Sequence, residues 1–486
     1  MQGDINMLFN SYIFVFLFLP MALIGYYTIN KTRKYALAEV YLIGMSLWFY
    51  GYFNISYLAI IIASILGNFT LATLMHKKEQ FKKLLVIVGI AGNIGVLFYY
   101  KYMGFFIENI NVIFKQDLEV TNILLPLGIS FFTFQQLSYI VDSYTGKSPV
   151  YNLREYALFV TFFPQLIAGP IVLHNETIPQ FRNENKKTFN IENFVQGLMA
   201  LSLGMGKKVI IADYLGGIVN VGYENVYMLT SIDAVIIMLA YTFQIYFDFS
   251  GYCDIATGIG KMFNIDMPMN FNSPYKAVTI VDFWKRWHIT LTRFLRTYVY
   301  FPLGGNRGGH KYINLLIVFL VSGIWHGANY TFIMWGIFHG LFMVFTKIFQ
   351  KYIDRLHPAL NWLMTFGFVN VTWILFRADS LGQAKTILFK MLKFTPSTVS
   401  SFISDGFKST DILFLINQLP IGQTIADTFV ILLVFGFLMI LILGTKNTNE
   451  RLGKPIGVIN AIGCALVLFW SIMLFSGIST FLYFNF

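Results

Sequence analysis

Residues 314–349 read NLLIVFLVSGIWHGANYTFIMWGIFHGLFMVFTKIF, an apolar run long enough for two membrane-spanning helices. One helix crosses the bilayer's hydrocarbon core, which is about 30 Å thick, with roughly 20 apolar residues. A polar break at residues 327–329 divides the run and predicts a helical hairpin with His326 beside its turn. This stretch therefore predicts an integral membrane protein.

The rest of the chain has the composition that this prediction requires. Its 486 residues are 56% hydrophobic and only 12% charged, whereas soluble domains carry about 25% charged residues. We predict one all-α, polytopic membrane domain over residues 1–486, with roughly ten to twelve transmembrane helices and further re-entrant or interfacial helices around a central cavity. The other apolar runs are residues 8–29, 35–75, 84–100, 123–141, 156–172, 232–249, 361–376, 425–443 and 458–482. Residues 35–75 are about twice the length of one span, and a break at Gly51 and Asn54 predicts two helices in a hairpin.

The positions of the charges indicate topology rather than a nucleic-acid partner. The net charge is +11, but Lys and Arg cluster between the apolar runs, as the positive-inside rule describes. The first run is followed by Lys31, Arg33 and Lys34, which predicts a retained first span that ends in the cytoplasm. We expect a multi-pass protein of the cell membrane, with residues 381–424 as an interfacial or extramembrane connection.

Two other segments depart from simple spans. Pro126 and Pro164 interrupt apolar runs and predict short or re-entrant helices, which are tolerated where protein buries the freed backbone groups. Residues 194–215 contain Lys207 and Lys208 in the middle of an apolar run. We expect this segment to lie in the membrane interface instead of crossing it.

Three histidines, His288, His326 and His339, fall in apolar surroundings. An ionisable side chain inside a membrane is a functional candidate by default. Gly323 and Gly327 flank His326 and leave room for a substrate or a second backbone. Catalytic and structural interpretations of His326 stay open at this point, and for His339 the structural one is favoured. Four further histidines lie beside polar residues and are expected in loops, namely His76, His174, His310 and His357.

Residues 282–298 predict a single basic amphipathic helix at the interface. One face carries Trp284, Trp287 and His288 with further apolar residues, and the basic residues Lys285, Arg286, Arg293 and Arg296 cover much of the rest. They form either a positive-inside loop or a basic collar for an anionic substrate. The glycine-rich loop that follows, residues 302–309 with Asn306, would offer backbone N–H groups to a phosphate, which is a weak signal alone.

A second polar cluster lies in the apolar residues 243–254, where Asp248 and Ser250 alternate with bulky side chains. Asp248 needs a partner at such depth. It could orient a histidine or an arginine, but a structural hydrogen-bond network between helices is the favoured interpretation. The cysteines, Cys253 and Cys464, show no metal-ligand spacing.

Eight motifs in order give these residues a common context. They are LGISFFTFQ (127–135), FPQLIAGPI (163–171), FDFSGYCD (247–254), NSPYK (272–276), DFWKRWH (282–288), PLGGNR (302–307), WHG (325–327) and FRA (376–378). In these motifs the sequence resembles the membrane-bound O-acyltransferase superfamily, specifically its bacterial alginate O-acetyltransferase branch. The resemblance spans about residues 125–380 and departs slightly at Cys253, where the family more often has Ser.

The resemblance implies that His326 is the catalytic histidine and His288 a second essential one. It implies acetyl transfer from a cytoplasmic thioester donor, with acetyl-CoA expected, to a polysaccharide outside the membrane through an extracytoplasmic esterase-fold partner. No tightly bound cofactor, metal or nucleic acid is expected. Candidate substrate-binding residues are Lys285, Arg286, Arg293, Arg296, Asp248, Ser250 and Asn306.

Two other functions stay open from the sequence. One is D-alanyl transfer from a carrier protein to teichoic acid by a related branch, which is usually shorter and lacks the extension at residues 377–423. The other is a transporter or flippase without acyl chemistry. Transporters commonly show repeated halves with paired broken helices, and no such repeat is apparent in the sequence.

Overall fold

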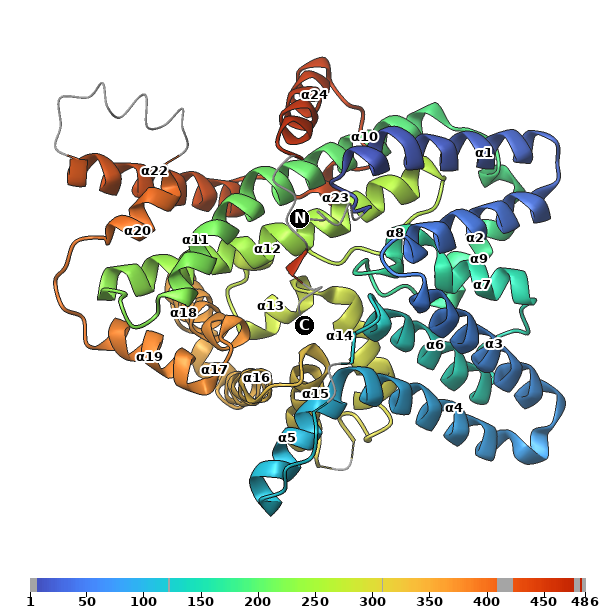
Figure 1. Cartoon of the computed structure of the whole chain (residues 1–486), viewed down its shortest axis with the longest axis horizontal. Coiled ribbons are helices and arrows are strands. Elements are labelled where there is room, and N and C mark those ends of the chain that lie inside the picture. Colours follow the sequence, from blue (N-terminus) through green and yellow to red (C-terminus); the bar gives the residue numbers. More distant parts are fainter. Residues whose placement is uncertain (1–6, 121–122, 308, 409–422, 476–480, 483–486) are drawn as a thin grey trace.

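The computed structural model describes residues 7–120, 123–307, 309–408, 423–475 and 481–482 (Figure 1). Every regular element in these ranges is a helix, which confirms the all-α prediction. Within them, eight helical stretches are long and apolar enough to cross a membrane, and two shorter apolar helices, Lys311–His326 and Val458–Met473, accompany them. The eight are Phe14–Lys31, Ser56–Lys77, Glu79–Phe114, Ile191–Glu224, Ser231–Met262, Tyr330–Ile348, Pro358–Arg377 and Ile425–Gly444.

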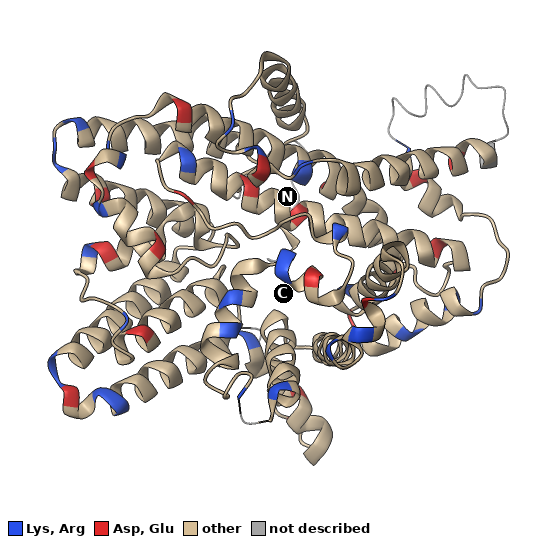
Figure 2. Cartoon of the chain, turned by 180° about the vertical axis from the view of Figure 1, so that it is seen from behind, with Lys and Arg blue, Asp and Glu red and all other residues tan. Residues whose placement is uncertain are grey.

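The N-terminal helices form successive hairpins along one side of the molecule (Figure 1). The predicted break near residue 51 is confirmed, because one helix ends at Gly51 and the next begins at Ser56. Lys and Arg gather at the turns at one edge of this layer (Figure 2). The elements are η1 (Phe14–Phe18), α1 (Leu19–Lys31), α2 (Tyr35–Gly51), α3 (Ser56–Lys77), η2 (Glu79–Phe81), α4 (Lys82–Leu97), η3 (Phe98–Tyr102) and α5 (Met103–Phe114).

Short helices follow where prolines were expected to interrupt the spans. Pro164 occupies the first turn of α8, a position at which the missing N–H removes no helical hydrogen bond. Pro126 precedes α6, whose N-cap Gly128 is left-handed at φ 72°. The elements here are α6 (Ile129–Tyr144), α7 (Leu153–Thr161), α8 (Phe163–Leu166), α9 (His174–Arg182) and η4 (Glu184–Lys186).

The centre of the fold is a pair of long helices. The first is continuous over Ile191–Glu224 and comprises α10 (Ile191–Met205), η5 (Gly206–Ala212) and α11 (Asp213–Glu224). It packs along α12 (Ser231–Met262), and a Cβ atom added at Gly204 would lie 2.7 Å from the carbonyl oxygen of Gly251. The two backbones approach closely, as small residues allow between membrane helices.

The predicted interfacial position of residues 194–215 is wrong. Both lysines that suggested it are neutralised inside the helix pair: Lys207 Nζ lies 2.6 Å from Asp254, and Lys208 Nζ lies 2.7 Å from Asp213 and from Asp248. Charged side chains at membrane depth pair with one another in this way. Asp254 and Asp248 lie 47 and 40 residues away from their lysines in the sequence, so the segment alone suggested the wrong location.

The C-terminal part surrounds this pair from the other side. The hairpin predicted at residues 314–349 is confirmed as α15 (Lys311–His326) and α16 (Tyr330–Ile348). In the predicted connection 381–424, α19 packs on α12 and α18, and residues 409–422 lie outside the described ranges. The other elements are η6 (Pro274–Lys276), α13 (Ile280–Arg286), α14 (Ile289–Leu295), η7 (Arg296–Tyr300), α17 (Gln350–Ile353), α18 (Pro358–Arg377), α19 (Leu381–Leu392), α20 (Ser401–Ser404), η8 (Asp405–Phe407), α22 (Gln423–Gly444), α23 (Thr448–Arg451) and α24 (Val458–Met473).

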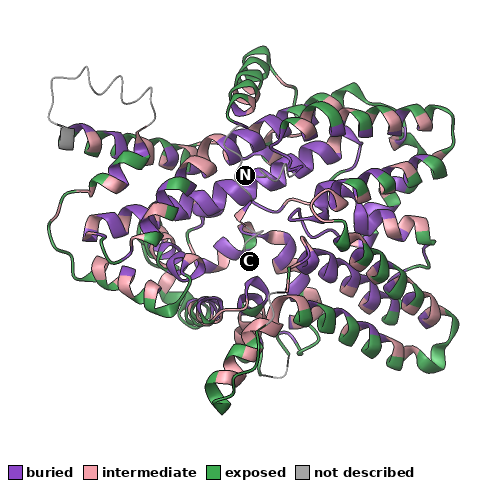
Figure 3. Ribbon diagram, in the orientation of Figure 1, coloured by how far each residue is buried: buried purple, intermediate pink, exposed green. Residues whose placement is uncertain are grey.

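Burial divides the molecule into a packed centre and an apolar rim. Buried residues concentrate along α10, α11 and α12 and around the middle of the molecule (Figure 3). Large apolar side chains are exposed on the outer helices, for example Leu432 and Ile440 on α22 and Phe469 on α24. Exposed apolar area on this scale is unfavourable in water. The rim therefore faces lipid.

Candidate active site

His326 is the last residue of α15, a helix too short to cross the whole hydrocarbon core of a membrane. The helix has 16 residues and, at 1.5 Å per residue, is roughly 24 Å long, less than the hydrocarbon thickness of about 30 Å. Gly323 allows close packing against α16, since a Cβ atom there would lie 2.4 Å from the carbonyl oxygen of Phe332. Gly323 was expected to leave room for a substrate or for a second backbone, and the structure shows the second backbone.

An aromatic cage surrounds the His326 ring, which is only 3% exposed. Ring centroids of Trp325, Trp335 and Phe376 lie 4.9, 5.1 and 5.0 Å from that of the imidazole, all in edge-on arrangements. His326 also borders a small cavity of about 40 Å³ with Lys101 and Ser130. The cage fixes the imidazole plane, and the cavity gives access to it.

Lys101 holds the end of α15 in place. Its Nζ donates hydrogen bonds to the backbone carbonyls of Trp325 (2.7 Å) and His326 (3.0 Å), and lies 3.3 Å from Ser130 Oγ. The last carbonyls of a helix have no intrahelical partner, and a cation there is favourable. We did not predict Lys101 from the sequence, although a lone lysine among the aromatic residues of η3 is the usual sign of a buried, functionally placed charge.

His288 lies at a sharp break, so the single helix predicted over residues 282–298 is wrong. Helix α13 ends at Arg286, Trp287 is extended, and His288 has a left-handed backbone at φ 45°. Such a conformation costs roughly 1–3 kcal/mol for a residue other than glycine. It is held by a backbone hydrogen bond on each side of the break, from Asn272 N to Arg286 O and from Ile289 N to Asn270 O, both 2.9 Å. The break turns the ring inward and leaves it fully buried.

Asn270 determines the tautomer of His288. The Asn270 Oδ1 atom accepts from the Thr290 backbone N–H (3.2 Å) and from the Thr290 hydroxyl (2.9 Å), while its Nδ2 donates to Cys253 Sγ (3.2 Å). The atom 3.1 Å from His288 Nδ1 is therefore an acceptor, and Nδ1 carries the proton. The lone pair of the neutral ring is then on Nε2. Asn270 was missed in the sequence because it precedes the NSPYK motif.

The two histidines meet around one side chain. The Trp325 ring lies 4.9 Å from the His326 ring and 6.1 Å from the His288 ring. Residues from α13–α14 and from the end of α15 thus form one buried centre.

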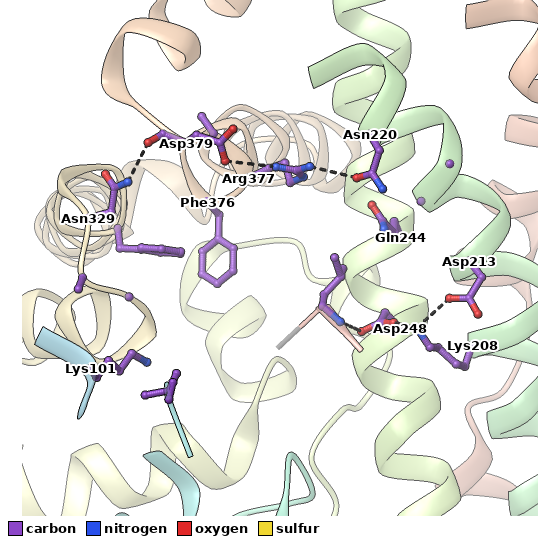
Figure 4. A pocket seen from close by; sticks show the side chains of 18 of the residues that line it. Lys101, Lys208, Asp213, Asn220, Gln244, Asp248, Asn329, Phe376, Arg377 and Asp379 are labelled. Atoms are coloured by element: carbon purple, nitrogen blue, oxygen red, sulfur yellow. Dashed lines mark hydrogen bonds and ion pairs between the residues drawn. The ribbon is translucent and has the colours of Figure 1, made fainter. Parts of the chain in front are cut away.

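A large polar cavity lies beside this centre on the side of the α15–α16 turn (Figure 4). It has a volume of about 860 Å³ and is lined by Gly327, Asn329, Phe376 and Arg377 among others. Arg377 donates to Asn220 (3.0 Å), and Lys101 also reaches the wall. Such a volume accommodates a sizeable polar ligand.

Asp248 lines this cavity but is bound within the fold. It accepts from Lys208 (2.7 Å) and from the backbone N–H of Leu482 (3.1 Å), so the favoured structural network is what the geometry shows. Neither described partner is a histidine or an arginine. Ser250 is buried and does not line the cavity.

A second pocket of about 320 Å³ runs along α15 from the opposite end of the hairpin. Lys285, Arg296, Asn306 and Lys347 line it, and it reaches Ser322, one helical turn before His326. Among the described residues, no carboxylate lies within ion-pair distance of Lys285 or Arg296. The remaining walls are mainly apolar, and this pocket, called the cationic pocket after its three basic residues, lies next to the buried centre.

The predicted basic collar is therefore divided. Arg286 bonds to Asp282 (2.9 Å), and Arg293 bonds to Glu176 and to the carbonyl oxygen of Ile171. These two arginines hold elements together and do not line the cationic pocket.

The expectation of free backbone N–H groups in the glycine-rich loop is wrong for four of its residues. The N–H groups of Leu303, Gly304, Gly305 and Arg307 donate to carbonyls within the turn, and Gly308 lies outside the described ranges. Asn306 accepts from the Tyr300 hydroxyl at 2.7 Å.

Two other histidines are structural. His339 bonds through Nε2 to Thr372 Oγ1 (2.9 Å), as the favoured interpretation requires. His174, expected in a loop, is instead fully buried at the start of α9, between Asp142 Oδ2 (3.0 Å) and the Tyr151 hydroxyl (2.9 Å). Its partners again come from distant segments. His76 also departs from the expectation, as it lies in α3.

The sequence is similar to those of known membrane acyltransferases. Residues 40–381 match the membrane-bound O-acyltransferase family. The peptidoglycan O-acetyltransferase of Helicobacter pylori is 38% identical over 99% of this chain and 98% of its own length. The probable alginate O-acetylase AlgI of Azotobacter vinelandii is 35% identical over 94% of this chain and 91% of its own. The teichoic acid D-alanyltransferase of Bacillus subtilis is 27% identical over 51% of this chain and 67% of its own. The family match includes both His288 and His326.

Proposed function

The chain belongs to the membrane-bound O-acyltransferase family, and from this premise we propose that it takes acetyl groups from a cytoplasmic thioester and passes them across the membrane for O-acetylation of a cell-wall or extracellular glycan. The protein is a multi-pass membrane O-acetyltransferase, as its relatives' names and its apolar helices indicate. The donor, the direction of transfer and the residue roles are the proposed part.

The observation that carries the proposal is that residues on either side of His326 line two different chambers, Ser322 the cationic pocket and Gly327 the polar cavity. The cationic pocket lies towards the end of the α15–α16 hairpin that carries Lys311 and Lys347, and the polar cavity lies beside the turn at residues 327–329. Because Lys and Arg are enriched on the cytoplasmic side, the cationic pocket opens to the cytoplasm of a bacterial inner membrane and the polar cavity to the outside.

The donor and the acceptor then approach one centre from opposite sides. The phosphates of acetyl-CoA are anionic, and Lys285 and Arg296 provide the matching charges in the pocket. The acyl thioester reaches past Ser322 towards His326. The acceptor, a hydroxyl group of an esterase-fold partner or of the glycan itself, enters through the polar cavity.

His326 acts as the general base in this scheme. Its imidazole takes the proton from the acceptor hydroxyl, the oxygen attacks the thioester carbonyl, and the carbon–sulfur bond breaks. The imidazolium returns the proton to the departing thiolate, so an ester and a free thiol result. His288 is fixed by Asn270 as the Nδ1–H tautomer, and its neutral ring orients the acceptor.

Peptidoglycan is the first acceptor to test. The Helicobacter pylori relative named for peptidoglycan aligns over nearly the whole of both chains, whereas the D-alanyltransferase aligns over about half of this one. The long match supports acetyl transfer over the D-alanyl alternative and over a transporter without acyl chemistry.

An assay in proteoliposomes tests the proposal. Purified protein is supplied with radiolabelled acetyl-CoA on the side of its basic loops, with peptidoglycan fragments and the cell's own esterase-fold protein on the other side. We expect acetylated glycan to form, and no transfer from a D-alanyl carrier protein. Transfer from the D-alanyl carrier instead of acetyl-CoA, or no transfer from either donor by well-folded protein, contradicts the proposal.

A further inference from the structure

A third cavity lies away from the histidines, at the lipid-facing rim. It is a groove of about 370 Å³ between η5, α12, α22 and α24, and its volume is in the range of ligand pockets, roughly 300–1,000 Å³. Figure 1 shows α24 beside α10 and α22 beside α20, both at the edge of the molecule. The acyl-transfer scheme makes no use of this groove.

The groove has an apolar wall and a cationic end. Its wall includes Ile211 of η5, Leu441 and Ile442 of α22, and Val467 and Trp470 of α24. Its end is formed by the connection between α22 and α24, where Lys446 and Arg451 lie. The apolar wall is suited to the acyl chains of a phospholipid, and the cationic end is suited to its phosphate headgroup.

The two cations are available for a ligand. Among the described residues, no carboxylate lies within ion-pair distance of Lys446 or of Arg451, whose Nε contacts only the carbonyl oxygen of Lys446 at 3.3 Å. The nearby acids are occupied: Asp254 binds Lys207 (2.6 Å) and Thr448 (2.5 Å). Lys207, which also lines the groove, is thereby neutralised.

The connection also carries one acid, Glu450, which does not line the groove. Its carboxylate accepts a hydrogen bond from the neutral amide of Asn447 at 2.7 Å and keeps its negative charge, against the two positive charges of Lys446 and Arg451. The connection itself is anchored, because Lys276 donates to the carbonyl oxygen of Thr445 at 2.8 Å. The end of the groove is thus a fixed platform with an excess of positive charge.

We propose that this groove binds an anionic phospholipid, whose phosphate headgroup contacts Lys446 and Arg451 and whose acyl chains lie along α22 and α24. Basic pockets between membrane helices recognise anionic headgroups by charge, and each Lys or Arg near such a headgroup favours binding by about fivefold. The loss of both cations should therefore weaken binding by about 25-fold.

Native mass spectrometry of the full-length protein in detergent, titrated with phosphatidylglycerol, tests the proposal. We expect saturable binding, weakened about 25-fold in the Lys446→Gln, Arg451→Gln double variant. A matched control, Lys351→Gln with Arg355→Gln, removes two basic residues that do not line the groove and should bind as the native protein does. A charge-preserving swap, Lys446→Arg with Arg451→Lys, should retain binding and shows that the double variant fails for loss of charge and not for loss of folding.

Two further arms distinguish the source of the phosphate and the role of the chains. Phosphatidylcholine with the same acyl chains should bind at least severalfold more weakly, and inorganic phosphate should not displace phosphatidylglycerol. Equal binding of both lipids, displacement by inorganic phosphate, or unchanged affinity in the double variant overturns the proposal.

Discussion

Replacing Lys101 with methionine should damage catalysis more than folding. The ammonium group donates to the carbonyls of Trp325 and His326 at 2.7 and 3.0 Å, and hydrogen bonds to charged groups are worth about 1.5–3 kcal/mol each. Against that loss, the variant no longer buries a charge, which itself costs several kcal/mol. The two effects largely offset each other, so we expect the stability to fall by no more than about 2 kcal/mol.

The effect on catalysis follows from the position of the bonds. They hold the last turn of α15, and a displacement of about 1 Å of a catalytic group can reduce the rate about 10²-fold. We therefore expect Lys101→Met to lower kcat roughly 10- to 100-fold while the KM for acetyl-CoA stays within about twofold. Lys101 is a positioning residue in this account.

Initial rates of acetyl transfer in proteoliposomes, measured beside thermal unfolding of the same preparation, provide the assay. Lys115→Met is the matched control, since Lys115 is exposed at the end of the same helical stretch and should be substituted without effect. A folded Lys101→Met protein with kcat within threefold of the native value would refute the reasoning. So would a change confined to the KM for acetyl-CoA.

Two further substitutions test the two sides of the centre. The double variant Lys285→Gln, Arg296→Gln should raise the KM for the acyl donor roughly 10-fold or more and change kcat little, because contacts far from the carbonyl bind the ground and transition states alike. Arg286→Gln is the control in the same titration. It removes a structural ion pair and should leave the donor KM unchanged. Asn270→Ala should lower kcat about 10²-fold, because His288 loses the hydrogen bond that fixes its tautomer and position. Cys253→Ser keeps an acceptor for the Asn270 amide and should retain activity in the same rate assay. Unaltered donor KM in the first variant, or native turnover in the second, contradicts the roles given to these residues.

Hydropathy predicted the architecture because the bilayer imposes it locally. The hairpin around residues 327–329 and the break after Gly51 follow from runs of apolar residues and from the polar or glycine residues between them. Such signals lie within single segments. They require no knowledge of what packs against what.

The wrong predictions share a different cause. Whether a charged or polar residue is buried depends on its partner, and the local sequence does not show that partner. Lys207 and Lys208 suggested an interfacial helix because two of their carboxylate partners, Asp254 and Asp248, lie on another part of the chain. His174 suggested a loop for the same reason, since Asp142 is 32 residues away. Single-segment patterns contain no information about such pairs.

The geometry of the candidate site could be predicted only partly from the sequence. His326 and His288 were found from motifs, and the structure brings both to Trp325. The apolar spacing of residues 282–298 fits a continuous helix, and nothing local revealed that Asn270 would stabilise a left-handed residue at position 288. Long-range hydrogen bonds overrode the local helical pattern there.

Acetyl transfer by the His326→Gln variant is the most direct test of the central claim, that this imidazole is the general base between the two chambers. The account predicts a loss of roughly 10²–10⁴-fold in turnover, the usual worth of positioned proton transfer, with membrane abundance and acetyl-CoA binding close to native. His339→Gln is the matched control, because His339 is equally buried but bonded to Thr372, and its folded fraction should remain active. A well-folded His326→Gln protein that acetylates its acceptor at a near-native rate would contradict the account.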